Sequence, residues 1–234
     1  DRHALAMKLL EAINYANDVI HDTAKQNKAQ TGMGTTCTAA ALIDDVLCLA
    51  QVGDSRAYII RNKKMYQMTQ DQTLVNKLLE IGQLKAEDAA HYEHSHVILQ
   101  ALGVRDKVEP VLSLVELLPG DALLLCSDGL NDALTDEQIV ELINFEHSSD
   151  PINVCKLLTE SACRAGARDN VTVIYSKFGG WGYGFGEPGV PLPYIKVSRD
   201  QYADHMLLLR NPPGGAETTQ VFGSFNLKKS SDPK

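Results

Sequence analysis

Two short motifs place a carboxylate at the end of a predicted strand. Asp128 follows the apolar run Ala122–Cys126, and Gly129 comes next. A carboxylate at the end of a buried strand is costly unless it is paired or bound to a cation, and a glycine lets the backbone approach a ligand closely. Asp169 stands just before the β-branched run Val171–Tyr175. Together the two motifs predict an oxygen-rich site for a hard cation, although each alone is also compatible with an Asp in a structural turn.

The elements that position these residues follow from hydrophobic periodicity. Apolar residues recur at helical spacing over residues 5–29, and further helices are predicted at 74–81, 85–91, 135–145 and 151–165. Thr135 and Gln138 form a capping-box pattern at the start of one of them. Strands are predicted at residues 36–43, 46–52, 57–61, 64–69, 108–117, 122–126 and 171–175. Short turns separate the first four strands, so we expect them to form an antiparallel meander. Runs of strands and runs of helices, without strict alternation, predict a layered α+β domain.

Bulk composition excludes some classes of function. The 234 residues carry a formal net charge of -8, with 30 acidic and 22 basic side chains, which argues against nucleic-acid binding. No apolar stretch reaches membrane-spanning length, so no membrane partner is expected. The five cysteines show no zinc-like spacing. We interpret them as small buried hydrophobic residues in a reducing, cytoplasmic compartment.

The composition changes at the glycine-rich run 179–186. Residues 178–234 are therefore predicted to be a Gly/Pro-rich linker and C-terminal extension, with 202–210 as the one ordered element. Three histidines, His91, His94 and His96, have a spacing that zinc sites also use. Because they fall in a polar segment, we interpret them as a solvated surface cluster.

Six ordered motifs together resemble the metal-dependent protein phosphatase family (PPM, or phosphatase 2C-like), and the bacterial members look most similar. The resemblance covers about residues 1–177, which we take as the phosphatase domain. The motifs are Gly32–Thr36, Val52–Tyr58, Met68–Gln72, Ala101–Gly103, Pro119–Gly129 and Asp169–Thr172.

The resemblance implies a four-layer αββα sandwich of two antiparallel sheets flanked by helices. It also implies two or three Mn²⁺ or Mg²⁺ ions that activate a water for in-line attack on phosphoserine or phosphothreonine. By the same match Asp128 and Asp169 are catalytic metal ligands, and Asp71 lies in a motif that resembles the region of the third metal. The implied partner is a phosphorylated protein, the product of a Ser/Thr kinase.

Other positions are interpreted differently. Gln72 stands where the family usually has a histidine, so an acid role there is not expected. Asp54 and Arg56 are interpreted as structural residues that hold neighbouring loops. Residues 74–97 match the variable flap beside the family's active site, which the resemblance links to substrate choice.

Relative to the family, the chain lacks the N-terminal motifs that carry a phosphate-binding Arg and the Asp that bridges two metals. We therefore expect an N-terminally incomplete domain, and we keep inactivity of the chain as given open as an outcome. Three explanations stay open. The chain is a trimmed form of an active phosphatase, as the absent initiator Met suggests; or it is a pseudophosphatase that serves as a binding or regulatory module; or the segment after Gly179 replaces the missing strands, with Asp200 or Asp204 supplying a carboxylate.

Overall fold

The protein folds into two antiparallel sheets in a computed structural model that describes residues 2–89, 92–94, 96–145, 150–179 and 194–197. The first sheet has the strand order β1-β2-β5-β8 and the second β4-β3-β6-β7. The strands of the first sheet are β1 (Cys37–Ile43), β2 (Val46–Val52), β5 (Val111–Glu116) and β8 (Tyr194–Val197). Those of the second are β3 (Arg56–Arg61), β4 (Lys64–Gln67), β6 (Ala122–Cys126) and β7 (Val173–Lys177).

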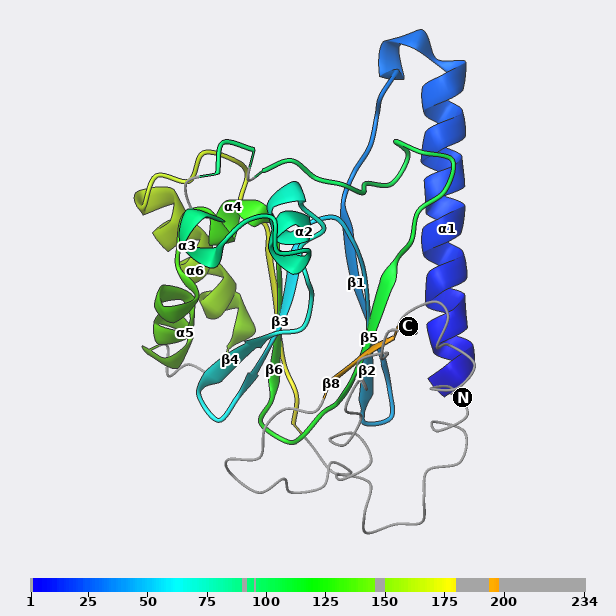
Figure 1. The fold of residues 1–234 in the computed structure, drawn as a ribbon. Coiled ribbons are helices and arrows are strands. Elements are labelled where there is room, and N and C mark those ends of the chain that lie inside the picture. Colours follow the sequence, from blue (N-terminus) through cyan, green and yellow to red (C-terminus); the bar gives the residue numbers. More distant parts are fainter. Residues whose placement is uncertain (1, 90–91, 95, 146–149, 180–193, 198–234) are drawn as a thin grey trace, which may run out of the picture.

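Helices cover the outer face of each sheet, as the predicted αββα sandwich requires (Figure 1). The long helix α1 (Arg2–Gln26) lies along the first sheet and buries Ala6, Leu10 and Ile13 against β2 and β5. The second sheet is covered by α4 (Asp128–Asn131), α5 (Asp136–Phe145) and α6 (Pro151–Arg164). The capping box at Thr135 and Gln138 is confirmed by two reciprocal hydrogen bonds of 2.9 and 3.3 Å.

The core between the sheets follows from strand alternation. In β2, which is buried along its whole length, Leu47 and Leu49 point toward the second sheet while Cys48 and Ala50 face α1. Because successive side chains of a strand point to opposite faces, a strand buried on both faces reads as one continuous apolar run. The strand therefore belongs to the middle of the sandwich.

The predicted meander of the first four strands is wrong at one connection. β1 pairs with β2 and β3 pairs with β4, but β2 and β3 belong to different sheets. Both edges of β2 are already paired, with β1 and β5, so β3 has no edge of β2 to join. Residues 53–55 instead carry the chain from one sheet to the other. Gly53 makes this possible with φ +107°, and an added Cβ there would lie 2.4 Å from the side chain of Thr36.

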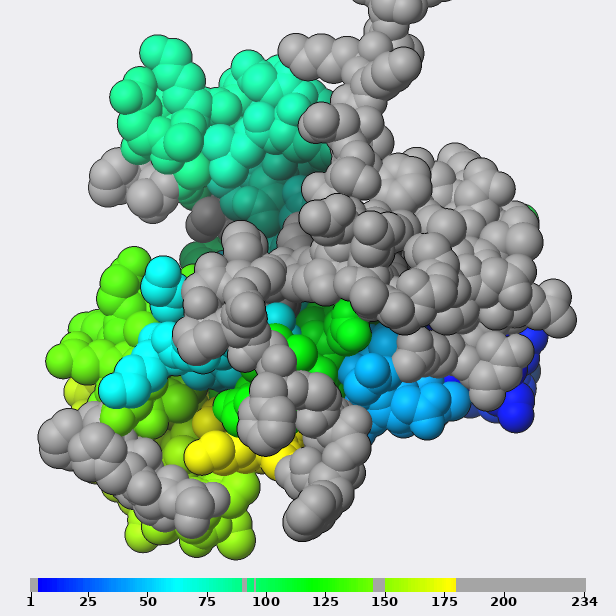
Figure 2. Space-filling view, turned by 90° about the horizontal axis from the view of Figure 1, so that it is seen from below, coloured from blue at the N-terminus to red at the C-terminus, as the bar shows by residue number. Residues whose placement is uncertain are grey.

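The predicted flap contains α2 (Leu74–Glu80), capped by Thr73, and the short α3 (Ala86–Ala89). Two backbone hydrogen bonds tie its two ends together, from Leu74 to Val97 and from Leu99 to Gln72. Figure 2 shows these helices, in teal, projecting from the body that the sheets and the other helices form.

The region interpreted as a linker and extension contributes one strand to the fold. β8 pairs antiparallel with β5, with Leu112 opposite Val197 and Val115 opposite Tyr194. The ordered element predicted at 202–210 and the carboxylates Asp200 and Asp204 lie outside the described residues. None of the described helices has the length and apolar character needed to span a bilayer.

Candidate active site

Strand register brings the candidate carboxylates to one end of the second sheet. Arg56, at the start of β3, is opposite Cys126, the last residue of β6, and Cys126 is opposite Val173, the first residue of β7. Asp54 precedes β3, Asp128 follows β6 and Asp169 precedes β7. Because antiparallel neighbours place the start of one strand beside the end of the next, the loops that carry these three residues emerge at the same end.

The Asp128 turn and the Asp169 loop are in direct contact. The Ser127 hydroxyl donates to the carbonyl oxygen of Asn170 (3.1 Å) and accepts from the amide of Thr172 (3.0 Å). The amide of Ser127 donates to the carbonyl oxygen of Thr172 (3.1 Å). Gly129 lies so close that an added Cβ would be 2.6 Å from the Asn170 carbonyl oxygen. The glycine after Asp128 is thus required by the approach of a second backbone.

Each of the two carboxylates is held by its own turn. One oxygen of Asp128 accepts from the amide of Gly129 (2.8 Å), and one oxygen of Asp169 accepts from the amide of Asn170 (2.6 Å). Asp128 is half-buried and Asp169 is exposed. Asp128 opens α4, a single helical turn that the sequence did not predict.

Asp54, interpreted from the sequence as a structural residue, lies at the same end of the sheet as Asp128. It lines a pocket of about 190 Å³ together with Asp128 and Asp132. Burial and then the negative charge of Asp128 raise the pKa of Asp54, with smaller contributions in the same direction from Asp71 and Asp132. The signal was present in the sequence, because Asp54 follows the buried strand β2 just as Asp128 follows β6.

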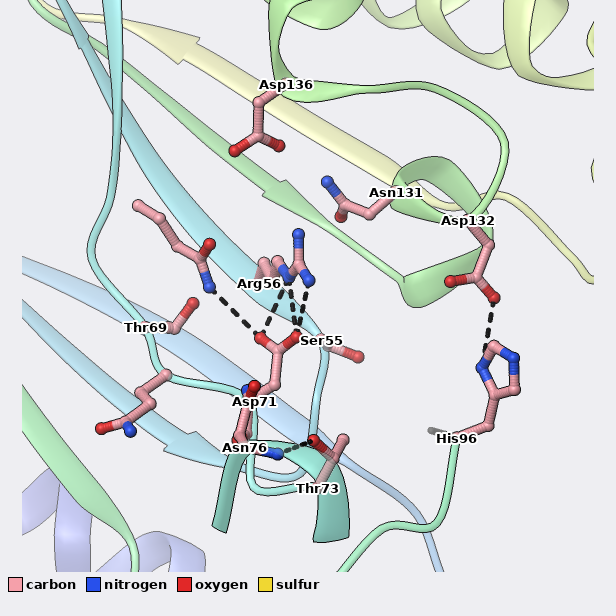
Figure 3. Close-up of polar contacts among 12 residues, drawn as sticks. Ser55, Arg56, Thr69, Asp71, Thr73, Asn76, His96, Asn131, Asp132 and Asp136 are labelled. Carbon is pink, nitrogen blue, oxygen red and sulfur yellow. Dashed lines mark hydrogen bonds and ion pairs between the residues drawn. The ribbon is translucent and has the colours of Figure 1, made fainter. Parts of the chain in front are cut away.

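Asp71 lines the same pocket but is engaged by a cation of the protein itself (Figure 3). Arg56 donates from Nε to both carboxylate oxygens (3.0 and 2.9 Å) and from Nη2 to one of them (2.7 Å). Gln67 donates to the same carboxylate at 3.2 Å. The structural role predicted for Arg56 is in keeping with these contacts, whereas the ligand role of Asp71 stays a prediction.

Gln72, at the position where the family usually has a histidine, has a structural contact. Its side-chain oxygen accepts from the amide of Gly53 at 2.8 Å, and its own amide donates to the Gly53 carbonyl at 3.0 Å. These two bonds hold the inter-sheet turn that carries Asp54.

The flap histidines do not form a metal site among the residues that the structure describes. His94 is exposed and stacks edge-on against Tyr92, and His91 lies outside the described residues. His96 is also exposed, and its Nδ1 lies 3.8 Å from a carboxylate oxygen of Asp132 across the pocket (Figure 3). The exposure of His94 and His96 agrees with the interpretation of these two residues as solvated.

The chemistry of the donors fits a hard divalent cation, but the set is incomplete. Carboxylate oxygens are the ligands that Mg²⁺ and Mn²⁺ prefer, and Asp54, Asp128 and Asp132 supply them around one pocket. Within the described part of the chain, however, no three His, Cys, Asp or Glu side chains are close enough to enclose an ion. The described residues therefore do not enclose an ion by themselves.

Comparison with known proteins identifies relatives along most of the domain. Residues 3–86 match the profile of the family "Protein phosphatase 2C", and residues 83–179 match that of "Stage II sporulation protein E (SpoIIE)". The chain is 35% identical over 184 residues to the serine/threonine protein phosphatase PstP of Mycobacterium tuberculosis, which covers 79% of this chain and 35% of PstP. It is 38% identical over 158 residues to the protein phosphatase PhpP of Streptococcus pneumoniae, which covers 67% of this chain and 63% of PhpP. The chain thus spans between about a third and two thirds of these curated relatives.

Solved structures show the same fold. The serine/threonine phosphatase Stp1 from Staphylococcus aureus superposes with a TM-score of 0.72 at 32% identity, over 77% of this chain and 70% of that one. The catalytic domain of PstP, solved in complex with two manganese ions, gives a TM-score of 0.65 at 37% identity, over 73% of this chain and 70% of that one.

Proposed function

The chain belongs to the protein phosphatase 2C (PPM) family, and on that premise we propose that it acts as a metal-dependent protein Ser/Thr phosphatase. The reaction is the hydrolysis of phosphoserine and phosphothreonine in proteins. The relatives described above are named as phosphatases, and this favours the enzyme over the binding-module alternative.

One observation carries the proposal, the contact between the two loops that the sequence singled out. Ser127 and Gly129 hold the Asp128 turn against the backbone of Asp169 and Asn170. This packing places two acidic turns side by side, an arrangement that a bound cation would stabilise. If the Asp128 turn had only a structural role, contact with the acidic Asp169 loop would not be expected.

We assign the carboxylates Asp128 and Asp169 to the metal site, and Asp54 with them. Asp54 shares the pocket with Asp128, whereas the carboxylate of Asp71 is neutralised by Arg56. We therefore favour Asp54 over Asp71 as the further ligand. A divalent cation bound there supplies Lewis-acid chemistry and an activated water. Mn²⁺ is the ion to test first, since a PstP catalytic domain has been solved with two manganese ions.

The substrate class follows from the same premise. PstP and PhpP are named as protein phosphatases, so we propose a phosphoprotein made by a Ser/Thr kinase as substrate. All five cysteines are free thiols, which supports a reducing compartment such as the cytoplasm.

The test is phosphate release from a phosphothreonine peptide by the 234-residue chain, with Mn²⁺ and with EDTA. Asp128→Asn keeps the shape of the side chain and removes its charge, so we expect it to abolish the Mn²⁺-dependent turnover. Asp22→Asn, on the exposed face of α1, is the matched control and is expected to behave as wild type. Turnover that survives EDTA, or that Asp128→Asn retains in full, contradicts the proposal.

A further inference from the structure

A buried tyrosine hydroxyl lies behind the pocket and joins three segments of the chain. Tyr58, in β3, is 0% exposed. Its hydroxyl oxygen accepts hydrogen bonds from Arg56 Nη1 (3.0 Å) and Asn131 Nδ2 (2.7 Å), and it donates to Asp136 Oδ1 (3.1 Å). Asn131 is the last residue of α4 and Asp136 is the first of α5. One hydroxyl therefore bonds to β3, α4 and α5 at once.

The position of Tyr58 follows from strand geometry. Residues two apart in a strand point to the same face, so Arg56 and Tyr58 both face the helix layer, and Figure 3 shows Arg56, Asn131 and Asp136 on this side of the sheet. Tyr58 packs with Leu124 and Leu130 in the core that this layer covers. A buried hydroxyl requires partners, and Tyr58 has three.

α4 depends on such contacts because it is only four residues long. A single helical turn is not stable by itself. It is held at Leu130, which is fully buried, and at Asn131, whose amide donates to Tyr58 and whose oxygen accepts from the thiol of Cys126 (3.1 Å). The first residue of this turn is Asp128.

The same network reaches the flap. Arg56 bonds to Tyr58 through Nη1 and to Asp71 through its other nitrogens. The backbone carbonyl of Asp71 accepts a hydrogen bond from the side chain of Asn76 in α2 (3.0 Å). An unbroken series of hydrogen bonds thus runs from Asn131 at the end of the Asp128 turn to the first turn of the flap helix.

We propose that Tyr58 is a positioning residue that holds the α4 turn, and with it Asp128, in register with the Arg56–Asp71 pair and the flap. The part of this proposal that concerns metal binding rests on the function proposed above; the part that concerns the α4 turn does not. Tyr58 does not line the pocket itself, so it acts through its partners.

Removal of the hydroxyl tests the proposal, because Tyr58→Phe keeps the ring in the core. The change leaves the half-buried Arg56 and Asn131 and the exposed Asp136 each without one partner, and the loss of hydrogen bonds between partly buried groups is destabilising. The α4 turn is the weakest of the joined segments, so it is expected to open first. Tyr175→Phe is the matched control, since Tyr175 packs in the same core and its hydroxyl has no hydrogen-bond partner in the described part of the chain.

The first measurement is amide hydrogen exchange without metal. The amide of Asp132 donates to the Asp128 carbonyl (2.8 Å) and that of Leu134 to the Leu130 carbonyl (2.9 Å), so both report on α4. In Tyr58→Phe we expect exchange at these amides to be about tenfold faster, the equivalent of one lost hydrogen bond. The amide of Ala165, at the end of α6, is expected to keep its wild-type rate. Asn131→Ala, which removes the partner on α4, is the second variant and is expected to reproduce the effect.

The second measurement is Mn²⁺ affinity by calorimetry. We expect Tyr58→Phe and Asn131→Ala each to weaken it about tenfold, with a double variant no weaker than either, because coupled partners are not additive. Wild-type exchange rates at Asp132 and Leu134 in both variants overturn the proposal, as does equal acceleration at Ala165. If the losses in Mn²⁺ affinity of Tyr58→Phe and Asn131→Ala add up in the double variant, the two residues are not coupled. If the wild-type chain binds no Mn²⁺, the proposed metal site is contradicted. The hydrogen-exchange result still decides whether Tyr58 positions the α4 turn.

Discussion

Gly129→Ala is the sharpest test of the site, because it adds one methyl group where two acidic loops meet. The backbone of Gly129 has no restriction to positive φ, so alanine is acceptable in conformation. The new Cβ would lie 2.6 Å from the carbonyl oxygen of Asn170 and 3.2 Å from its carbonyl carbon. Both are backbone atoms, so no flexible side chain can rotate away.

The size of the effect follows from these contacts. Ordinary contact at such a Cβ begins near 3.4 Å, so the Asp169–Asn170 loop must move by about 0.8 Å from the Asp128 turn. Overpacking of this kind costs about 1–3 kcal/mol in the free energy of unfolding. Displacement of a reacting group by about 1 Å can cost on the order of 100-fold in rate. We therefore expect a modest loss of stability and a loss of Mn²⁺-dependent kcat/KM of about 100-fold.

The assay measures both quantities in one pair of variants. Urea denaturation in EDTA gives the metal-independent stability, and phosphopeptide hydrolysis with Mn²⁺ gives kcat/KM. Gly179→Ala is the control, since a Cβ at Gly179 meets nothing within 4 Å and both quantities should stay at wild-type values. A Gly129→Ala protein with kcat/KM within about threefold of wild type would refute the reasoning that the contact sets the geometry of the site.

Three further outcomes are expected. Asp121→Asn removes one partner of the buried Arg61–Asp121 ion pair, whose side chains are 5% and 1% exposed. The free energy of unfolding in a urea titration should therefore fall by about 3–5 kcal/mol. A fall under about 1 kcal/mol contradicts the role of the pair. Asp54→Asn should weaken Mn²⁺ binding in calorimetry by at least about tenfold, as expected for a charged ligand; unchanged affinity removes Asp54 from the site. Burial raises the pKa of the Cys126 thiol to about 12, so its reactive thiolate form is scarce up to about pH 10. A disulfide reagent at about pH 8 should therefore modify the exposed Cys163 before Cys126. Equal rates of modification at Cys126 and Cys163 contradict this order.

Local patterns were sufficient for most of the elements. The strands Val46–Val52 and Ala122–Cys126 have the predicted bounds, because each is a continuous apolar run closed by turn residues. The helix over Arg2–Gln26 and the capped helix at Asp136 were predicted from periodicity and from the capping box. These signals are local, so one sequence is enough to interpret them.

Pairing between strands was predicted less well, because it depends on edges that the sequence does not show. The short turn after Val52 suggested a hairpin, but β5 occupies that edge of β2 and is about 60 residues away in the chain. The Tyr58 hydroxyl bonds to Asn131 and Asp136, each more than 70 residues away, and no local pattern predicts such contacts.

The register of the second sheet explains why the acidic loops could be grouped in spite of this limit. Arg56, Cys126 and Val173 are neighbours across three strands, so the loops beside them must emerge together whatever their side chains are. A shift of two residues keeps each side chain on its face but moves a loop by about 7 Å along the strand. The buried apolar runs thus have a functional consequence, because the side chains that fix the register of β3, β6 and β7 also fix how far apart Asp54, Asp128 and Asp169 lie. Substitutions that disturb this register, even in the core far from the pocket, are expected to reduce metal affinity before they unfold the domain.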